Sequence, residues 1–284
     1  GATWFRGSMI GRGGFGSVYI ATLKNPKSKF TCYPPIFAVK SAEVSLSSSI
    51  QKERQILTQI NAPRCPYILR CYGDETTTAK NGLMVYNLLL EYASGGTLSS
   101  RIKNSGNPVG IPETEAKSYA KCILRGLKHI HQLGYIHCDL KPDNIFLFPV
   151  KARGGGSSPA RFRAKIGDFG LAKRTKPNNK RKLNTSWEGT PMYLSPEAVV
   201  DKLQDFGSDV WAFGCVVVEM LTGRSMWGGG NRDGILARIG SGSGCRIPDG
   251  ISEGAKSFLK GCFAVKPGFR FTADMLLNHP FLEG

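Results

Sequence analysis

The N-terminal third of the chain alternates apolar and polar positions over short stretches that glycine or proline interrupts. A period of two is typical of β-strands that bury one face. Five strands are therefore predicted, at residues 4–11, 17–23, 35–40, 67–72 and 82–92. Between the third and fourth strands, four apolar residues recur at helical spacing before Pro63: Ile50, Ile56, Leu57 and Ile60. The pattern predicts a small antiparallel sheet with one helix.

Beyond Gly95-Gly96 the apolar positions take a helical period. One apolar face begins just after Pro112 and consists of Ala116, Tyr119, Ala120, Ile123, Leu124, Leu127 and Ile130. Residues 210–221 are apolar nearly all round, which indicates a buried central helix, with Ser208 as its predicted start cap and Gly223 as its end cap. We predict an α+β fold with an N-lobe over 1–92 and a mainly α C-lobe over 93–284.

Composition limits the classes of protein that need to be considered. The chain has 284 residues, which suffice for one large domain or two joined lobes. Its 8 cysteines lack the paired spacing of metal ligands and indicate reduced thiols, so an intracellular location in cytoplasm or nucleus is expected. The longest apolar run, 210–221, is too short to span a bilayer and contains Glu219. Because the chain starts at Gly1 and stops after a predicted last helix, we expect flanking segments in a longer protein.

The net charge of +17 raises the possibility of a phosphate-rich partner. Much of the positive charge falls in two segments without acidic residues, one after Phe148 and one after Leu171. Solvated loops and docking of an acidic or phosphorylated partner both remain open. Nucleic-acid binding is not expected, because the only aromatic residues interleaved with these charges are Phe162 and Trp187.

A glycine-rich segment, Gly11-Arg12-Gly13-Gly14-Phe15-Gly16-Ser17-Val18, lies between the first two predicted strands. Glycine lets backbone N–H groups approach phosphate oxygens closely. Dinucleotide-binding loops lead into a helix, whereas a strand follows here. Lys40 ends the third strand, where its ammonium can reach phosphates, and Glu53 is the only acidic residue on the predicted helix, able to pair with Lys40.

The segment His137-Cys138-Asp139-Leu140-Lys141-Pro142-Asp143-Asn144, with Asp168-Phe169-Gly170 further on, has the residue types and spacing that phosphoryl transfer needs. Asp139 is predicted to orient or accept the proton of a substrate hydroxyl, and Lys141 to neutralise charge on the transferred group. Asn144 and Asp168 supply hard oxygen ligands for Mg²⁺. The predicted catalytic residues are Asp139, Lys141, Lys40 and Glu53, and the predicted metal ligands are Asn144 and Asp168.

In these motifs the chain resembles the eukaryotic protein kinase family, and the resemblance covers residues 4–282. This resemblance implies the bilobal fold of that family. Leu88-Leu89-Leu90-Glu91-Tyr92-Ala93 is similar to the hinge, with Leu90 as gatekeeper and the backbones of Glu91 and Ala93 as adenine partners. The resemblance implies Mg²⁺ and ATP as cofactors. The implied ATP contacts are Ile10, Gly11, Arg12, Gly13, Gly14, Phe15, Gly16, Ser17, Val18, Ala38, Lys40, Leu90, Glu91, Ala93, Asn144, Phe146 and Asp168.

Further marks of the family follow in order. Gly189-Thr190-Pro191-Met192-Tyr193-Leu194-Ser195-Pro196-Glu197 resembles the end of the activation segment, and the resemblance pairs Arg270 with Glu197 in a buried structural contact. Asp209 resembles the anchor of the central helix. Lys141 together with Thr190 is similar to the serine/threonine-specific pattern. The family resemblance also implies an internal hydrophobic column of Leu57, Cys71, His137 and Phe169.

Cys138 stands where most protein kinases have an arginine that pairs with a phosphate on the activation segment. Cysteine cannot make this pair. Two consequences stay open: the segment is ordered without a phosphate, or other basic groups such as Lys173 and residues 180–182 meet one. Thr175, Thr185 and Ser186 are the candidate modification sites, and we expect Thr185 or Ser186 to tune activity only modestly.

The His-Cys-Asp form and the Trp4-Phe5-Arg6-Gly7 opening make the chain similar to plant mitogen-activated protein kinase kinase kinases. This resemblance implies a protein substrate that is itself a mitogen-activated protein kinase kinase. A plant receptor-type kinase, which often lacks the same arginine, is one alternative. A pseudokinase that acts as a scaffold is another, although the catalytic set is intact in this sequence.

Overall fold

The computed structural model describes residues 3–25, 33–79, 81–106, 110–150, 161–175, 187–242 and 245–283. The chain forms two units, each with its own core. The first unit is Gly1–Ser94 with Asp168–Gly170, and the second is Gly95–Gly167 with Leu171–Gly284. The short segment Asp168–Gly170 therefore packs with the N-terminal unit, although the chain on either side of it belongs to the C-terminal unit.

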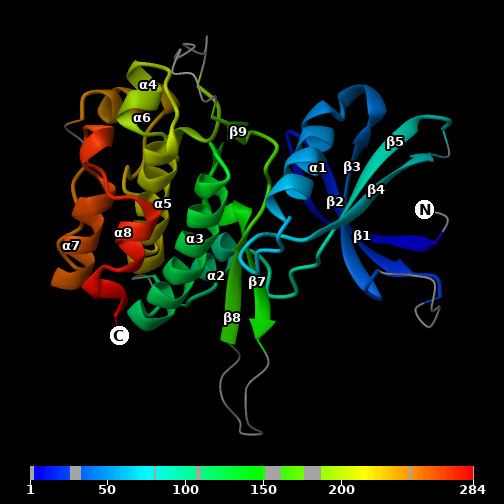
Figure 1. The fold of residues 1–284 in the computed structure, drawn as a ribbon, viewed down its shortest axis with the longest axis horizontal. Helices are drawn as coiled ribbons and strands as arrows, with labels where there is room; N and C mark the ends of the chain where they lie inside the picture. The colour runs from blue at the N-terminus through cyan, green and yellow to red at the C-terminus, as the bar shows by residue number, and fades with distance from the viewer. Residues whose placement is uncertain are drawn as a thin grey trace, which may run out of the picture. The chain divides into compact units, whose positions relative to one another are not determined.

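The first unit is an antiparallel sheet of five strands in the order β1-β2-β3-β5-β4, with one helix, α1, packed on it (Figure 1). Its elements are β1 (Trp4–Gly13), β2 (Gly16–Leu23), β3 (Ile36–Glu43), α1 (Ser48–Ile60), β4 (Cys71–Thr78) and β5 (Met84–Leu90). The predicted sheet with one helix is confirmed. Ser47 occupies the N-cap of α1, but its hydroxyl donates to the Val44 carbonyl instead of capping the helix.

The predicted position of the fourth strand, 67–72, is wrong. Ile68 and Leu69 are buried there but belong to no strand, and Pro66 just before this segment lacks a backbone N–H donor. The strand instead occupies the more polar β4 at the sheet edge, where alternate side chains face solvent. Three β-branched threonines at its end favour the extended conformation. Burial of an apolar run therefore does not by itself place a strand.

The second unit is mainly helical, as predicted. Its helices are α2 (Leu98–Lys103), α3 (Glu113–Gln132), α4 (Pro196–Val200), α5 (Phe206–Thr222), α6 (Arg232–Gly240), α7 (Glu253–Cys262) and α8 (Ala273–Leu277). The helix α3 begins after Pro112, and all seven residues of its predicted apolar face are buried. Among the described residues, no helix is long and apolar enough to cross a membrane.

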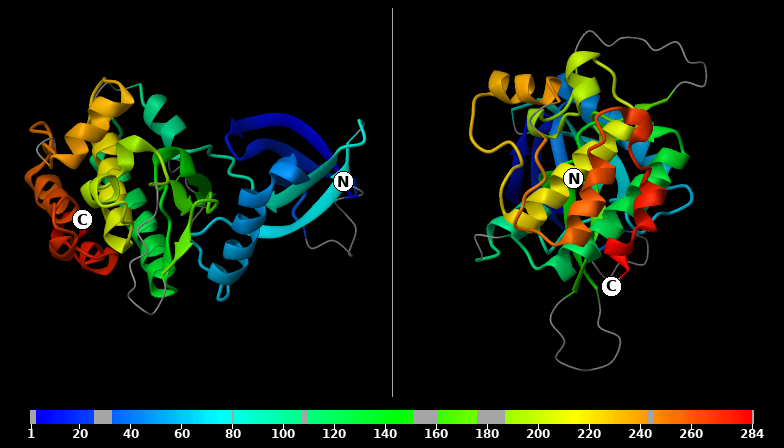
Figure 2. Two further views of the ribbon diagram at one scale, coloured as in Figure 1. Left: turned by 90° about the horizontal axis from the view of Figure 1, so that it is seen from above. Right: turned by 90° about the vertical axis from the view of Figure 1, so that its left-hand side faces the viewer.

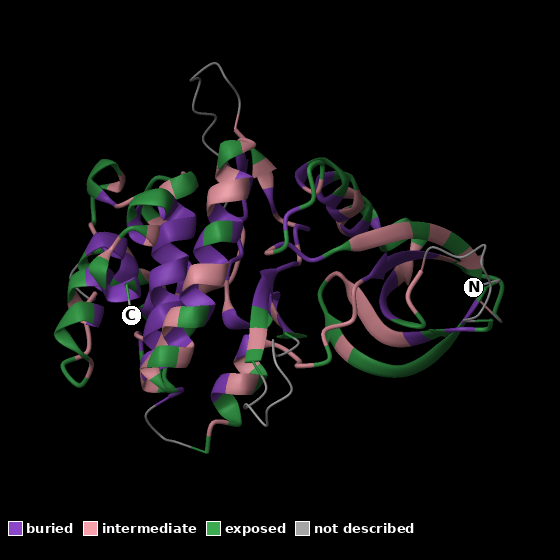
Figure 3. Ribbon diagram, turned by 60° about the horizontal axis from the view of Figure 1, so that its bottom comes forward, coloured by how far each residue is buried: buried purple, intermediate pink, exposed green. Residues whose placement is uncertain are grey.

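The central helix α5 is buried along most of its length (Figure 3). Its N-cap is Asp205 and not Ser208 as predicted. Asp205 accepts a hydrogen bond from the Ser208 backbone, and the Ser208 hydroxyl accepts one from the Asp205 backbone, which completes a capping box. Gly223 ends the helix at φ 67°, as predicted, because glycine tolerates this left-handed conformation.

Short strands complete the second unit: β6 (Tyr135–Ile136) pairs with β9 (Lys173–Arg174), and β7 (Ile145–Val150) pairs with β8 (Arg161–Ile166). The β7–β8 hairpin carries the predicted insertion, whose tip lies outside the described residues (Figure 2). Lys165 was expected in a basic loop, but it lies on β8 and is buried, with its ammonium 4.4 Å from the centre of the Phe148 ring. A cation over an aromatic face explains how this charge is accommodated.

Candidate active site

Lys40, Glu53 and Asp168 form an ionic triangle within the first unit. The Lys40 ammonium lies 2.7 Å from Glu53 Oε2 and 2.9 Å from Asp168 Oδ1. Glu53 also accepts a hydrogen bond of 3.2 Å from the Phe169 backbone, so the helix α1, the strand β3 and the Asp168–Gly170 segment are tied together. The predicted pairing of Lys40 with Glu53 is thus present.

Burial and the neighbouring charges shift the pKa values of Lys40 and Glu53. Burial alone would lower the pKa of Lys40, but the charges of Glu53 and then Asp168 outweigh it and raise the pKa above its ordinary value. Burial raises the pKa of Glu53, and Lys40 opposes that rise. Lys40 therefore stays positively charged across the neutral range. A permanent charge at this point suits the binding of an anionic ligand.

The strand register places several predicted ATP contacts on one face of the sheet. Val18 lies opposite Lys40, and Leu90 lies opposite Ala38. Since side chains at i and i+2 of a strand share a face, these four side chains line the same surface. Ile10 on β1 is 48% exposed, which leaves it available for contact with a ligand.

The glycine-rich loop is a tight hairpin turn between β1 and β2, with Gly13 paired to Gly16. Gly16 has φ 130°, and a Cβ there would collide with the Ser41 carbonyl. At Gly13 and Gly14, by contrast, a Cβ would meet no described atom within 4 Å, and φ is not positive. Neither packing nor backbone strain requires glycine at these two positions. Close approach of phosphate groups to the backbone is a reason that fits them.

The hinge that follows β5 bears on the prediction that the backbones of Glu91 and Ala93 bind adenine. The Glu91 backbone N–H donates to the Arg70 carbonyl at 2.9 Å, so this N–H is already engaged within the protein. Ala93 makes no backbone hydrogen bond to a described residue, which leaves both of its main-chain groups for a ligand. Phe146 lies on β7 in the second unit, bridged to Thr97.

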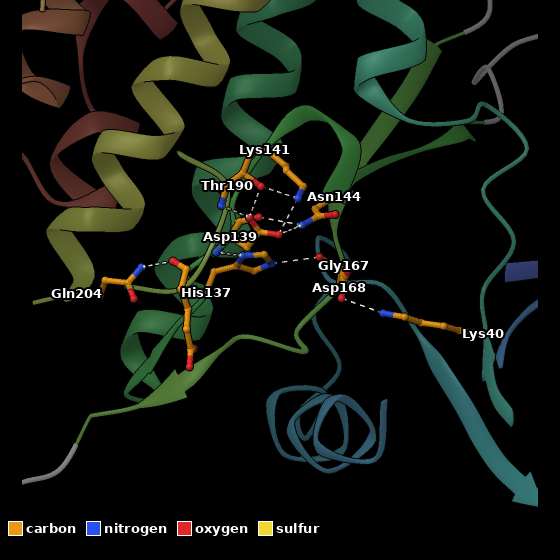
Figure 4. A network of polar contacts seen from close by, with 10 residues as sticks. Lys40, His137, Asp139, Lys141, Asn144, Gly167, Asp168, Thr190 and Gln204 are labelled. Carbon is orange, nitrogen blue, oxygen red and sulfur yellow. Dashed lines mark hydrogen bonds and ion pairs between the residues drawn. The ribbon is translucent and has the colours of Figure 1, made fainter. Parts of the chain in front are cut away.

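In the second unit, four donors surround the Asp139 carboxylate (Figure 4). Oδ1 accepts from the Thr190 backbone at 2.9 Å and from the Thr190 hydroxyl at 2.8 Å. Oδ2 accepts from Lys141 Nζ at 2.8 Å and from Asn144 Nδ2 at 3.1 Å. Lys141 Nζ also donates to the Thr190 hydroxyl at 2.7 Å. The carboxylate is therefore held in one orientation, with a cation beside it.

Asn144 has a geometry that suits a metal ligand. Its Nδ2 donates twice to Asp139, to the backbone carbonyl at 2.8 Å and to the carboxylate at 3.1 Å. These two bonds fix the amide, and its Oδ1 accepts no hydrogen bond from the described residues. A fixed neutral oxygen is a ligand that Mg²⁺ prefers, so this amide fits the predicted role of Asn144. Asp168, the other predicted ligand, belongs to the first unit and also carries hard oxygen atoms.

The backbone around Asp139 is held by two buried side chains. Asp209 at the start of α5 accepts from the backbone N–H of His137 at 2.8 Å and of Cys138 at 3.0 Å. Cys138 has φ 66°, which is uncommon for a residue with a Cβ, so these bonds stabilise a strained conformation. His137 Nδ1 accepts from the Asp139 backbone, and its Nε2 donates to Gly167 O at 3.1 Å. The residue before Asp168 is thereby linked to Asp139.

The residues of the implied hydrophobic column are all buried or partly buried. Leu57, His137 and Phe169 are fully buried, and Cys71 is partly buried. Burial raises the pKa of the Cys71 thiol to about 11. A thiol with this pKa is protonated at neutral pH, as expected of a packing residue.

Sequence reasoning missed some partners of the site. It used Thr190 only as a mark of hydroxyl specificity, whereas the Thr190 side chain contacts both Asp139 and Lys141. It assigned no role to Glu188 or Gln204, which contact Lys173. These residues lie far apart in the sequence and belong to no local motif. Only the fold brings them together.

Comparison with known proteins defines the class. The protein kinase domain matches residues 4–282. The chain therefore belongs to the protein kinase family. It is a serine/threonine protein kinase, and it is similar to mitogen-activated protein kinase kinase kinases of plants.

Three of these relatives come from Arabidopsis thaliana. Mitogen-activated protein kinase kinase kinase 20 is 42% identical over 98% of this chain and 78% of its own length. Mitogen-activated protein kinase kinase kinase 17 is 37% identical over 98% of the chain and 69% of its own length. Mitogen-activated protein kinase kinase kinase 18 is 37% identical over 98% of the chain and 77% of its own length.

Replacing Lys40 by methionine is expected to lower kcat/KM for ATP about a hundredfold, the typical cost of removing one preorganised electrostatic contact. The variant keeps the length of the side chain but removes the cation that Glu53 and Asp168 hold. Initial rates at varied ATP concentration measure the effect. Lys52→Met is the matched control, because Lys52 lies on α1 beside Glu53 and makes no ion pair with a described residue. Equal losses in both variants would contradict the assignment.

Proposed function

We propose that this kinase transfers the γ-phosphate of Mg-ATP to a serine or threonine hydroxyl of a mitogen-activated protein kinase kinase. The Asp139 cluster carries the proposal: a carboxylate fixed by Thr190 and Asn144, with the Lys141 ammonium 2.8 Å away. The substrate class rests on the names of the relatives, which are kinases of kinase kinases. One domain over 1–284 and an intracellular location are part of the same proposal.

Each residue has a chemical task in this reaction. Asp139 orients the acceptor hydroxyl and takes up its proton, and the bonds from Thr190 to Oδ1 keep the carboxylate in place. Lys141 sits where a positive charge offsets the charge on the transferred phosphoryl group. Asn144 and Asp168 would hold the metal, which supplies neutralisation of phosphate charge when it is bound. Lys40 would orient the α- and β-phosphates, and Glu53 positions Lys40.

The pseudokinase alternative lacks a supporting observation. A scaffold without activity needs neither the buried Lys40–Glu53 pair nor the fixed Asn144 amide. Burial of such charged and polar groups costs folding free energy, so a catalytic role explains why the chain keeps them. Both are formed in this chain. Radiolabel transfer from ATP is the direct test, and ATP binding without transfer to any protein would favour the scaffold.

A panel of catalytically inactivated kinase kinases tests activity and substrate class together. We expect label on serine or threonine of at least one plant mitogen-activated protein kinase kinase and little on a generic basic protein. The reverse pattern would favour the receptor-type alternative. Titration with duplex and single-stranded nucleic acid at physiological salt tests whether the positive charge serves that other class of partner, since nonspecific electrostatic binding weakens strongly under those conditions.

A further inference from the structure

One surface of the second unit is built from two segments that contain no acidic residue. Residues 116–138, which include most of α3, have neither Asp nor Glu, and the same holds for residues 145–166, which include β7 and β8. The helix α3 packs beside β8 (Figure 1). The fold therefore joins two positively charged stretches of the chain. We call Lys121, Arg125, Arg161 and Arg163 the basic surface.

The basic surface is open to solvent. Lys121 and Arg125 lie one turn apart on α3 and share a face of the helix. Arg161 and Arg163 are separated by one residue on β8 and share a face of the strand. The three arginines are exposed and Lys121 is partly exposed. Arg161 makes no ion pair with a described residue, so its charge is accessible to a ligand.

The two elements of the basic surface meet at Cys122 on α3. Burial raises the pKa of the Cys122 thiol, whereas a hydrogen bond with the Ala164 backbone and the charges of Arg125 and Arg163 oppose that rise. Both guanidinium groups therefore lie close to the contact between α3 and β8. A ligand that meets one of them is within reach of the other.

Carboxylates of the protein meet α3 at its two ends. Glu113 pairs with Lys117 at 3.3 Å near the start of the helix, and Asp274 of α8 pairs with Lys128 near its end. Between these ends, Lys121 makes no ion pair with a described residue. Because neighbouring like charges repel one another, an anionic ligand would stabilise the middle of this surface.

The apolar side chains near the basic surface favour a protein over other anionic partners. A Cβ at Gly95 would lie 2.6 Å from the Phe162 ring, so this ring packs on the Gly95 backbone. Phe148 is buried beneath the Lys165 ammonium. Neither ring offers the open face on which nucleic-acid bases stack. Across the described parts of α3, β7 and β8, Val150 is the only exposed large apolar side chain, which gives a lipid bilayer little to bury.

We propose that the basic surface docks an acidic segment of a protein partner. Guanidinium groups bind carboxylates through two parallel hydrogen bonds. Arginines at alternate positions of β8 match carboxylates at alternate positions of an extended peptide, because both chains have the same period. The basic surface shares no residue with the Asp139 cluster. The proposal goes beyond the proposed kinase function and does not depend on phosphoryl transfer.

Fluorescence anisotropy of a labelled peptide in which glutamate alternates with serine measures docking. We expect saturable binding at low ionic strength that weakens as salt is added, because salt screens exposed charges. A peptide with glutamine in place of each glutamate should not bind. If the glutamate peptide failed to bind, or if both peptides bound equally well, the proposal would be overturned.

The Lys121→Glu/Arg161→Glu double variant should bind the glutamate peptide about tenfold more weakly, because each reversal replaces an attraction by a repulsion. Lys260→Glu/Lys266→Glu is the matched control with the same change of net charge. Both lysines are exposed, make no ion pair with a described residue, and lie on α7 or just after it, away from β8 (Figure 1). The control should bind within about twofold of wild type. Equal weakening in both variants would show that net charge alone attracts the peptide.

A chemical cross-link locates the bound peptide. A carbodiimide activates the peptide carboxylates, and the amine of a nearby lysine then displaces the activated group, which forms an amide bond and releases a urea. Mass spectrometry should find Lys121 linked much more often than Lys260 or Lys266. Links that favour Lys260 or Lys266 would contradict docking on the basic surface.

A single-stranded oligonucleotide and vesicles that contain phosphatidylserine test the two other kinds of anionic partner at physiological salt. We expect unlabelled glutamate peptide to displace the labelled peptide at a lower concentration than either of them. The opposite order would overturn the assignment to a protein partner. If no substrate is phosphorylated, the proposed function fails, but these binding measurements still decide the role of the basic surface.

Discussion

Asp139→Asn is expected to lower kcat for protein phosphorylation about a thousandfold, within the range that loss of a general base produces. Asparagine has nearly the same size but is a poor proton acceptor. It also cannot satisfy the donors around it. Lys141 and Asn144 donate to one oxygen, and Thr190 donates twice to the other, so an amide nitrogen placed on either side would face a donor. The variant loses both the base and the order of the cluster.

Single-turnover rates with radiolabelled ATP measure this loss, and ATP affinity by equilibrium titration shows whether nucleotide binding survives. Asp143→Asn is the matched control. Asp143 lies on the short turn Pro142–Asn144 that follows Asp139, is exposed, and accepts no hydrogen bond from a described residue. We expect its kcat at saturating substrate to stay within about twofold. A turnover for Asp139→Asn close to that of Asp143→Asn would remove Asp139 from the chemistry.

Periodicity predicted those elements whose burial is regular. The face of α3 and the nearly all-apolar α5 are visible in sequence because burial follows the helical period directly. The fourth strand was predicted too early in the sequence, because the position of β4 is decided by pairing with β5 at the sheet edge and not by its own hydrophobicity. The cap of α5 was misplaced by three residues, since Asp205 and Ser208 are both good cap formers and only the geometry distinguishes them.

The residues of the candidate site also fall into those that the sequence predicts and those that it does not. Asp139, Lys141 and Asn144 lie within one short segment, so their spacing alone suggested a shared task, and the resemblance to a family supplied the roles. The partners that fix them come from distant segments: Thr190 for Asp139, and Gln204 for Lys173. No local pattern marks a hydroxyl or amide that becomes a partner only after folding. Residues that position a catalytic group are therefore harder to predict than the group itself.

Replacing Arg270 by methionine is expected to lower the free energy of unfolding by about 3–5 kcal/mol, the typical cost of breaking a buried ion pair by removing one partner. Arg270 Nη1 and Nη2 lie 2.7 and 3.1 Å from the two carboxylate oxygens of Glu197, and the arginine side chain is 0% exposed. Methionine fills part of the volume but leaves the buried Glu197 carboxylate without its cation, although the Ser208 hydroxyl still donates to it. The pair joins α4 to the segment before α8.

Burial alone would raise the pKa of Glu197, but the hydrogen bond and charge of Arg270 outweigh it and lower the pKa below its ordinary value of 4.5. The stabilisation is therefore present above pH 4.5 and is lost as the pH falls through the folded-state pKa. In Arg270→Met, no charge opposes the effect of burial, so we expect the pKa of Glu197 to rise and this variant to lose stability as the pH rises. The difference between the two proteins should be largest at neutral pH and should shrink on acidification.

Urea unfolding at several pH values, with Glu197→Gln and the double variant, tests this ion pair. Because each single variant leaves a buried group without its partner, the double variant should be less destabilised than the sum of the singles, by about 1–3 kcal/mol. Arg246→Met is the control: its pair with Asp249 is 3.2 Å long but 87% and 83% exposed. Exposed pairs contribute at most about 1 kcal/mol. A loss in Arg270→Met no larger than in Arg246→Met, or one independent of pH, would show that Glu197 is not stabilised by this arginine.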